Sequence, residues 1–169
     1  MTEPAARPLL GVVVSSTRAA DGRREDLTGP RIAAWGQARG FEVTGPHVVA
    51  DGPEVGLLLR RLVDNGCALV LTTGGTGFTA DDHTPEQTSA LIDRPAPGVA
   101  EAIRARGLGT TPHAALSRGV AGICGATLLV NLAGSTGAVR EGLEVLDGFI
   151  DHALEQLGHA RPTAPPLHT

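Results

Sequence analysis

Short apolar runs alternate along the chain with segments in which apolar residues recur every three or four positions. Leu9 to Val14 and Ala68 to Thr72 are continuous apolar runs rich in β-branched residues. Runs of this kind are typical of strands that are buried on both faces of a sheet. Similar patterns predict further strands over Phe41–Val49, with an interruption near Gly45-Pro46, and a hairpin or pair of short strands over Val120–Ile123 and Thr127–Leu132.

Helical spacing follows most of these runs. Val55, Leu58 and Leu62 fall on one face of a helix that we expect to begin at Pro53 and to end at Asn65-Gly66. The apolar positions between Val139 and Leu157 predict one long helix after Ser135-Thr136. Start and stop signals predict three more helices, over 28–40, over 84–91 with Thr84 as the capping residue, and over 99–106.

Strands that alternate with helices predict an α/β fold, with a mostly parallel sheet and helices on both of its faces. The chain has 169 residues, of which 41% are hydrophobic, so it can bury one sizeable core and is near the usual size of one domain. We therefore expect a single domain over residues 1–169. A short N-terminal extension (about 1–8) and a disordered C-terminal tail (about 160–169) should flank it.

Composition excludes several classes of partner. The formal net charge is -4 and only 2% of the residues are aromatic, which argues against binding to nucleic acid or to an anionic membrane. No apolar run approaches the roughly 20 residues of a membrane span, so we expect a cytoplasmic protein. Cys67 and Cys124 lie among apolar residues without metal-ligand or redox spacing, which predicts buried, reduced thiols.

Three loops of small hydrogen-bonding residues follow predicted strands, at 15–17, 73–77 and 131–135. In a parallel sheet the ligand binds beyond the carboxyl ends of the strands, so these loops can meet at one edge. Backbone amides in glycine-rich turns hold anions, which predicts a ligand that carries phosphate. Glycines in one such loop alone would be explained equally well by a tight turn.

The composition also limits the choice of phosphate ligand. The chain contains no Lys, so a Walker A loop is absent, and no G-x-G-x-x-G follows the first strand. A flavin would suit the serine-rich first loop. The few aromatic residues leave little to cover a flavin ring, and we place that alternative well behind.

Several motifs together resemble the molybdenum-cofactor biosynthesis family, which includes the bacterial Mog and MoaB proteins and one domain of gephyrin. They are TTGGTG at 72–77, D-x-TPE-x-T from Asp82, PG at 97–98 with Glu101 three residues later, LSRGVAGI at 116–123 and LLVNL-G-S at 128–135. The similarity extends from about Leu9 to Leu157. It implies a three-layer α/β/α fold, homotrimers or trimer-based assemblies, and binding of molybdopterin.

Members of the Mog branch transfer AMP from Mg-ATP to the terminal phosphate of molybdopterin, and the resemblance implies the same roles here. Asp82 and Asp51 match the functional aspartates, which implies that they are catalytic and hold Mg²⁺. Thr17 and Asp26 in the first loop are left out of this set. The implied binding residues for molybdopterin and ATP are Ser16, Thr73, Gly74, Gly75, Thr76, Gly77, Glu101, Ser117, Arg118, Asn131, Gly134 and Ser135.

Two interpretations remain open at this point. The residues alone allow Asp51 and Asp82 to be ordinary acidic groups at helix starts. Asp81 stands where the family commonly has Arg, and Ala133 and Thr136 replace two family prolines, so the loop is less restricted before binding. The sequence therefore predicts either an Mg-dependent molybdopterin adenylyltransferase or a non-catalytic molybdopterin carrier or scaffold.

Overall fold

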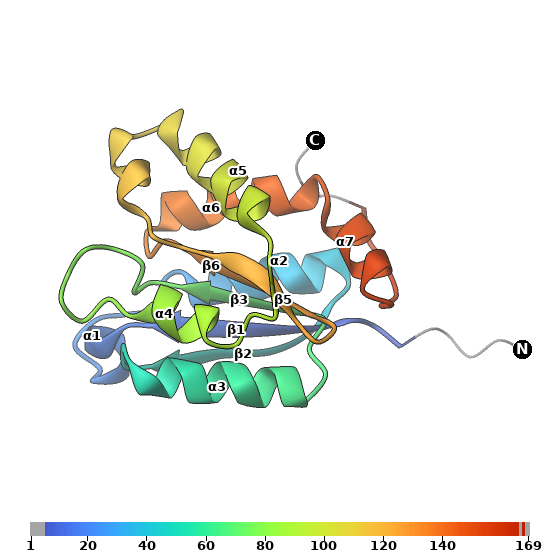
Figure 1. The fold of residues 1–169 in the computed structure, drawn as a ribbon, viewed down its shortest axis with the longest axis horizontal. Coiled ribbons are helices and arrows are strands. Elements are labelled where there is room, and N and C mark those ends of the chain that lie inside the picture. Colours follow the sequence, from blue (N-terminus) through green and yellow to red (C-terminus); the bar gives the residue numbers. More distant parts are fainter. Residues whose placement is uncertain (1–5, 166, 168–169) are drawn as a thin grey trace, which may run out of the picture.

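The computed structural model describes residues 6–165 and 167, and these contain a six-stranded sheet (Figure 1). The strand order is β2-β1-β3-β6-β5-β4. The neighbouring strands β2, β1, β3 and β6 run parallel to one another. Strand β5 runs antiparallel to β6, and β4 runs antiparallel to β5. The predicted α/β class and the predicted hairpin are confirmed. The strands are β1 (Leu9–Ser15), β2 (Glu42–Val49), β3 (Leu69–Thr73), β4 (Arg94–Pro95), β5 (Ala121–Cys124) and β6 (Thr127–Leu132).

Helices cover both faces of the sheet, which gives the expected three layers (Figure 1). Successive side chains of a strand point to opposite faces, so Leu10 and Val12 pack with α2, α6 and α7, while Val13 packs with α3. The helices are α1 (Thr17–Ala20), α2 (Gly29–Arg39), α3 (Pro53–Asp64), α4 (Thr84–Ser89), α5 (Pro97–Leu108), the 3₁₀ helix η1 (Pro112–Leu116), α6 (Thr136–Asp147) and α7 (Ile150–Gln156).

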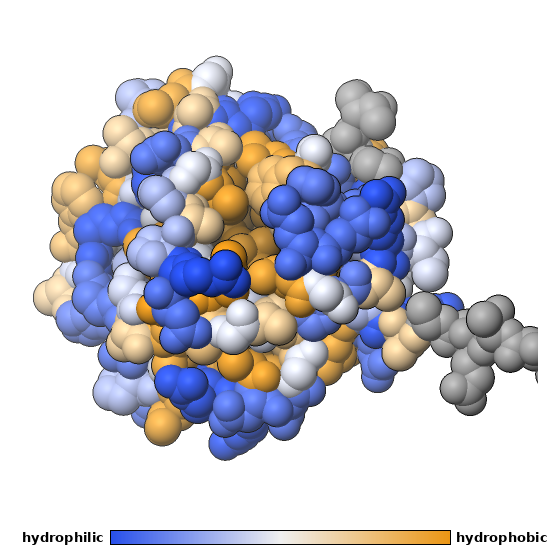
Figure 2. Space-filling view, turned by 45° about the vertical axis from the view of Figure 1, so that its right-hand side comes forward, coloured by the Kyte–Doolittle hydropathy of each residue, from blue (hydrophilic) through white to orange (hydrophobic). Residues whose placement is uncertain are grey.

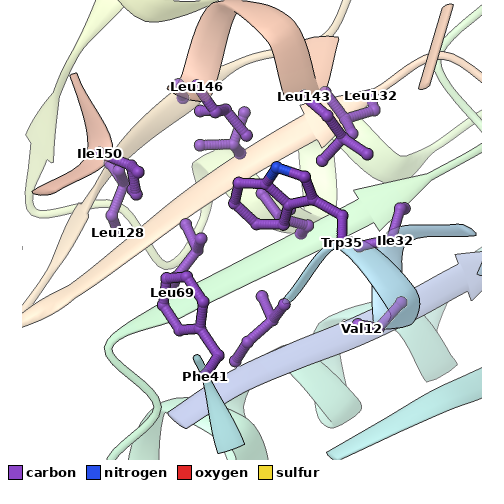
Figure 3. Packing of buried hydrophobic residues seen from close by; sticks show 14 of the residues in the cluster. Val12, Ile32, Trp35, Phe41, Leu69, Leu128, Leu132, Leu143, Leu146 and Ile150 are labelled. Atoms are coloured by element: carbon purple, nitrogen blue, oxygen red, sulfur yellow. The ribbon is translucent and has the colours of Figure 1, made fainter. Parts of the chain in front are cut away.

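The larger hydrophobic core lies between the sheet and the layer that contains α2 and α6 (Figure 3). Trp35 of α2 stacks on Phe41, the residue before β2, with ring centroids 5.7 Å apart. Leu69 and Leu128 from the central strands contribute to the same core.

Outside the core, the face in Figure 2 carries hydrophobic residues near its centre with hydrophilic residues around them.

A buried polar cluster joins α2 to the two C-terminal helices. Arg39 is fully buried, forms an ion pair with Asp151 and lies 3.5 Å from Asp147. The indole nitrogen of Trp35 donates a hydrogen bond of 3.1 Å to the same Asp147. The positive charge of the buried Arg39 is therefore balanced by the carboxylates of Asp147 and Asp151, and Asp147 also accepts the hydrogen bond from Trp35.

The predicted long C-terminal helix is wrong, because it is divided into α6 and α7. The N–H groups of Gly148 and Phe149 bond to the carbonyls of Val145 and Leu146, three residues back, which closes α6 in a tight turn. Phe149 then leaves the helical backbone region, with φ at -145°. The break redirects the chain, and the apolar face of α7 still enters the core.

Three other local expectations also meet a different arrangement. Thr84 is the first residue of α4 rather than its capping residue, and no side-chain hydrogen bond caps this helix; the N–H of Thr84 bonds to the carbonyl of Gly75. Part of the segment expected to be disordered lies against the end of α2, where Ala164 donates a hydrogen bond to the carbonyl of Arg39. At the other end, Pro8 is buried and its carbonyl accepts from Glu42. The expectations for residues 1–5, 166, 168 and 169 lie outside the described residues.

Within the described part of the chain, none of the helices combines the length and the apolar character that crossing a membrane requires.

Candidate functional site

The strand order creates a crevice at the carboxyl ends of β1 and β3. From β1 the chain passes through α2 to β2, and then through α3 to β3 on the other side of β1. The turn after β1 leads to α2 on one face of the sheet, whereas the turn after β3 leads to α4, which packs beside α3 on the other face, so the two turns lead away from each other. A cleft of about 1220 Å³ opens at this point.

The three loops predicted to meet at one edge do lie together in this cleft. Thr73 donates a hydrogen bond of 3.1 Å to the carbonyl of Ala133, and the N–H of Gly74 bonds to the carbonyl of Leu132. Gly74 has a φ of +88°, and a Cβ on it would lie 2.3 Å from the carbonyl oxygen of Ser15. The close approach of the loops after β1, β3 and β6 therefore requires glycine at position 74.

Asp51 joins the turn after β2 to the turn after β1. One carboxylate oxygen accepts a hydrogen bond of 2.5 Å from the hydroxyl of Ser15. The other accepts from the N–H and the hydroxyl of Thr17, at 3.2 and 3.3 Å. The alternative interpretation of Asp51 as a cap of α3 is wrong, because Gly52 precedes that helix and no side-chain hydrogen bond caps it.

Asp82 lies in a tight turn of the loop between β3 and α4. Its Oδ2 accepts hydrogen bonds from the N–H and the hydroxyl of Thr79, at 3.0 and 2.6 Å. Its own N–H bonds to the carbonyl of Thr79, and His83 separates it from α4. Asp82 therefore does not cap α4 either. The second oxygen, Oδ1, receives no hydrogen bond from the residues that the structure describes, and Asp82 lines the cleft.

Most of the residues that the sequence predicted for the site line the cleft. Besides Asp51 and Asp82, they are Ser16, Thr73, Gly74, Gly75, Thr76, Gly77, Ser117, Gly134 and Ser135. Asp81, the departure from the family pattern, is exposed and lines it too.

Arg118 does not line the cleft and instead holds the loop that carries Asp82. Its guanidinium donates to the carbonyl oxygens of Gly77 and Asp82, at 2.8 and 2.7 Å, and pairs with Glu86. The hydrogen bond from Arg118 is the main reason that the pKa of Glu86 falls below its ordinary value. Arg118 therefore supports the loop that carries Asp82, and its direct contact with the ligand stays a prediction.

Asn131 and Glu101 also lie away from the cleft. The amide nitrogen of Asn131 is buried and donates to the hydroxyls of Thr72 and Thr88, both at 2.9 Å, so this side chain ties β6 to β3 and α4. Glu101 is exposed on α5, whose Ile103, Arg104 and Gly107 face the cleft.

Sequence reasoning missed several residues that line the cleft. Asp26 was set aside, yet its carboxylate caps the start of α2 through the N–H groups of Thr28 and Gly29, both at 3.0 Å. Glu141 of α6 is almost fully buried and lines the cleft from the side of α5. Glu141 carried no specific signal in the sequence, because it is one of several charged residues in a helical stretch. Arg18, Arg24, Arg104 and Thr110 also line the cleft.

No group of three or more His, Cys, Asp or Glu side chains among residues 6–165 is arranged to hold a metal ion. The acidic residues of the cleft come from separate segments: Glu25 and Asp26 precede α2, Asp51 follows β2, Asp81 and Asp82 follow β3, and Glu141 lies in α6. A metal bound between them would take further oxygen ligands from a substrate.

Comparison with known proteins agrees with this geometry. The sequence profile of the family described as "probable molybdopterin binding domain", MoCF_biosynth, matches residues 11–152. Gephyrin of Dictyostelium discoideum is 38% identical over 157 residues, which cover 86% of this chain but only 22% of gephyrin. The molybdopterin adenylyltransferase of Haemophilus influenzae is 39% identical over 139 residues, which cover 80% of this chain and 71% of that protein.

A solved structure has the same fold. The molybdopterin biosynthesis Mog protein from Mycobacterium ulcerans superposes with a TM-score of 0.84 at 46% sequence identity, over 91% of this chain and 99% of that one. The profile match covers well over half of the chain, and the fold and the sequence agree along nearly the same residues. The chain belongs to the molybdenum cofactor biosynthesis family.

Proposed function

We propose that the protein binds molybdopterin and transfers AMP from Mg-ATP to the terminal phosphate of molybdopterin. The observation that carries this proposal is the placement of a glycine loop and two separate carboxylates, Asp51 and Asp82, around one cleft at the switch point of the sheet. The name of the Haemophilus influenzae relative supports the same activity.

The reaction brings several negative charges together. An oxygen of the molybdopterin phosphate attacks the α-phosphorus of ATP, the bond from that phosphorus to the bridging oxygen breaks, and pyrophosphate leaves. The site must therefore hold phosphates in line and offset their charge. The consecutive N–H groups of Gly75, Thr76 and Gly77 donate to none of the described residues, so they are available to phosphate oxygens.

Arginines supply positive charge on one side of the cleft. Arg18 and Arg24 line it, and neither lies within 4.0 Å of a carboxylate of the described residues. A guanidinium binds phosphate through parallel hydrogen bonds, so both side chains suit the phosphates of a nucleotide. The hydrogen bonds of Asp51 with Thr17 fix the start of α1 and hence the position of Arg18.

The two aspartates fit a magnesium ion that arrives with its substrate. Mg²⁺ prefers oxygen ligands and is commonly held by one or two carboxylates together with substrate phosphates. Asp82 has an oxygen without a hydrogen bond from the described residues, and Asp51 is anchored by Ser15 and Thr17. When bound, the ion would offset phosphate charge and favour departure of pyrophosphate.

The direct test is to incubate the purified chain with molybdopterin and Mg-ATP and to measure AMP-molybdopterin and pyrophosphate. The variant Asp82→Asn has nearly the same shape without the charge. It should abolish turnover and leave molybdopterin affinity largely intact, because the charge serves the metal and the nucleotide. The matched control is Glu54→Gln, which removes an acid at the start of α3, outside the cleft. Wild-type turnover in Asp82→Asn would remove the role given to Asp82.

A second function, a non-catalytic molybdopterin carrier, is favoured by Asp81 alone. Its carboxylate adds negative charge to the cleft at the position where the family commonly has Arg. Molybdopterin binding without any AMP-molybdopterin, at all Mg²⁺ concentrations, would support the carrier and contradict the transferase.

A further inference from the structure

Glu141 is a buried charged residue at the end of the cleft formed by α5, η1 and α6. Only 4% of its surface is exposed, although it belongs to the cleft lining. Buried carboxylates are normally paired and hydrogen-bonded at both oxygens, because desolvating an unmatched charge is costly.

The contacts of Glu141 are concentrated on one oxygen. Its Oε1 accepts a hydrogen bond from the hydroxyl of Thr110 and lies 3.7 Å from guanidinium nitrogens of both Arg106 and Arg140. Its Oε2 receives no hydrogen bond from any residue that the structure describes. One oxygen therefore anchors α6 to the chain after α5, and the other has its hydrogen-bonding capacity unused.

Gly107 leaves Oε2 uncovered. A Cβ at position 107 would lie 3.7 Å from Oε2 and 2.8 Å from the Cβ of Ala114. The absence of a side chain therefore permits η1 to pack closely on α5 and keeps bulk away from the carboxylate. Ile103 and Leu116 line the same end of the cleft and offer apolar surface to a flat ring.

The chemistry of a free carboxylate oxygen selects one kind of ring. A pterin presents two neighbouring donors, the 2-amino group and the adjacent ring N–H, and no acceptor lies between them. Adenine presents an amino group beside a ring nitrogen that accepts, an arrangement that amide side chains recognise best. A carboxylate, which only accepts, matches the pterin and repels the acceptor of adenine.

We propose that Oε2 of Glu141 accepts hydrogen bonds from the amino-pyrimidine edge of the pterin, so that this end of the cleft selects the ring of molybdopterin. The assignment rests on the proposed function, in which molybdopterin is a substrate. It places the pterin between α5 and α6 and leaves the glycine loop and the two aspartates for the phosphates.

The test measures the affinities of free pterin and of lumazine, in which an oxo group replaces the 2-amino group, by calorimetry or fluorescence quenching. The wild-type protein should prefer pterin by about 10- to 100-fold, the effect expected of a hydrogen bond to a charged group. In Glu141→Gln the amide oxygen can still accept from Thr110. Its NH₂ group then faces the donors of the ring, and the preference for pterin should disappear.

The matched control is Glu144→Gln. Glu144 lies on the same helix and contacts the same two arginines, Arg106 and Arg140, but does not line the cleft. It should keep the wild-type preference, and thermal denaturation should show all three proteins folded. A preference for pterin that survives in Glu141→Gln, or that Glu144→Gln loses equally, would overturn the proposal, as would a wild-type protein that does not distinguish the two rings.

A parallel titration with AMP and IMP, which differ in the same amino-to-oxo exchange, separates the two rings. Loss of an AMP preference in Glu141→Gln would assign the subsite to adenine and overturn the pterin assignment. Neither pterin nor lumazine carries phosphate, so these affinities remain measurable if the protein transfers no AMP. Failure of the proposed transferase activity is therefore distinguishable from failure of this subsite.

Discussion

The guanidinium of Arg118 donates a hydrogen bond of 2.7 Å to the carbonyl oxygen of Asp82. The two residues are 36 positions apart, and the same guanidinium also bonds to the carbonyl of Gly77. The backbone N–H of Arg118 bonds to Thr76, so the ends of the loop are fixed at three carbonyls. Arg118 therefore sets the place of Asp82 from outside the cleft.

We predict that Arg118→Gln lowers adenylyl transfer by about 10- to 100-fold, since a displacement of about 1 Å in a catalytic group can have an effect of this size. The Mg²⁺ concentration for half-maximal turnover should rise, because Asp82 is no longer held. Amide hydrogen exchange of residues 77–83 should also become faster, which reports on the loop independently of the reaction.

The control for this variant is Arg161→Gln, which removes an arginine from an exposed pair with Glu155, outside the cleft. A Mg-ATP titration of Arg118→Gln, Asp82→Asn and the double variant shows whether Arg118 acts through Asp82. The double variant should bind no more weakly than Asp82→Asn, because the two residues form one unit. Additive losses would mean that Arg118 acts on the nucleotide by another route.

Asp81 should make ATP binding depend steeply on Mg²⁺. Two neighbouring acids at the cleft repel free triphosphate and attract a cation that bridges to it. Asp81→Arg should strengthen ATP binding by between a few tenths and about 3 kcal/mol, depending on screening, and should relax the metal requirement. Calorimetric titration of ATP with and without Mg²⁺ measures both effects. Equal affinity of the two proteins in every condition would place Asp81 outside the nucleotide site.

Gly75 should be required for folding as well as for binding. Its φ is +65°, and a Cβ there would lie 2.2 Å from the hydroxyl of Thr84 and 2.6 Å from the carboxylate of Asp51. Gly75→Ala should therefore lower the free energy of unfolding in urea by about 2 kcal/mol or more. Gly98→Ala is the control, because nothing lies within 4 Å of a Cβ at that helical position. An unchanged urea midpoint for Gly75→Ala would show that the loop tolerates a side chain.

The thiol of Cys67 should be unreactive in the folded protein. Burial raises its pKa from 9.0 to about 11, so the thiol stays protonated near pH 8 and a disulfide reagent should label it only after denaturation. In the unfolded chain the thiol ionises at the lower pKa. Its contribution to stability is therefore complete below pH 9 and is lost as the pH rises toward 11. Labelling of folded protein at pH 8 would contradict the burial.

Local patterns in the sequence were sufficient to predict most of the fold. The apolar runs of β1 and β3 and the helical spacing of α3 depend on neighbouring residues only, and the structure has all three. The small residues after β1, β3 and β6 also predicted a cleft at one edge, because parallel strands bring their carboxyl ends together.

The tertiary structure alone decided which polar side chains line the cleft. The family resemblance implied ligand contacts for Arg118 and Asn131, and the structure shows that their hydrogen-bond partners in distant segments also make them supports of the loop and the sheet. Glu141 looks like an ordinary helix charge in the sequence, yet the folded chain buries it beside Arg106 and Thr110 at the edge of the cleft. Spacing along a chain specifies periodicity, whereas burial and hydrogen bonding depend on segments that only the folded chain brings together.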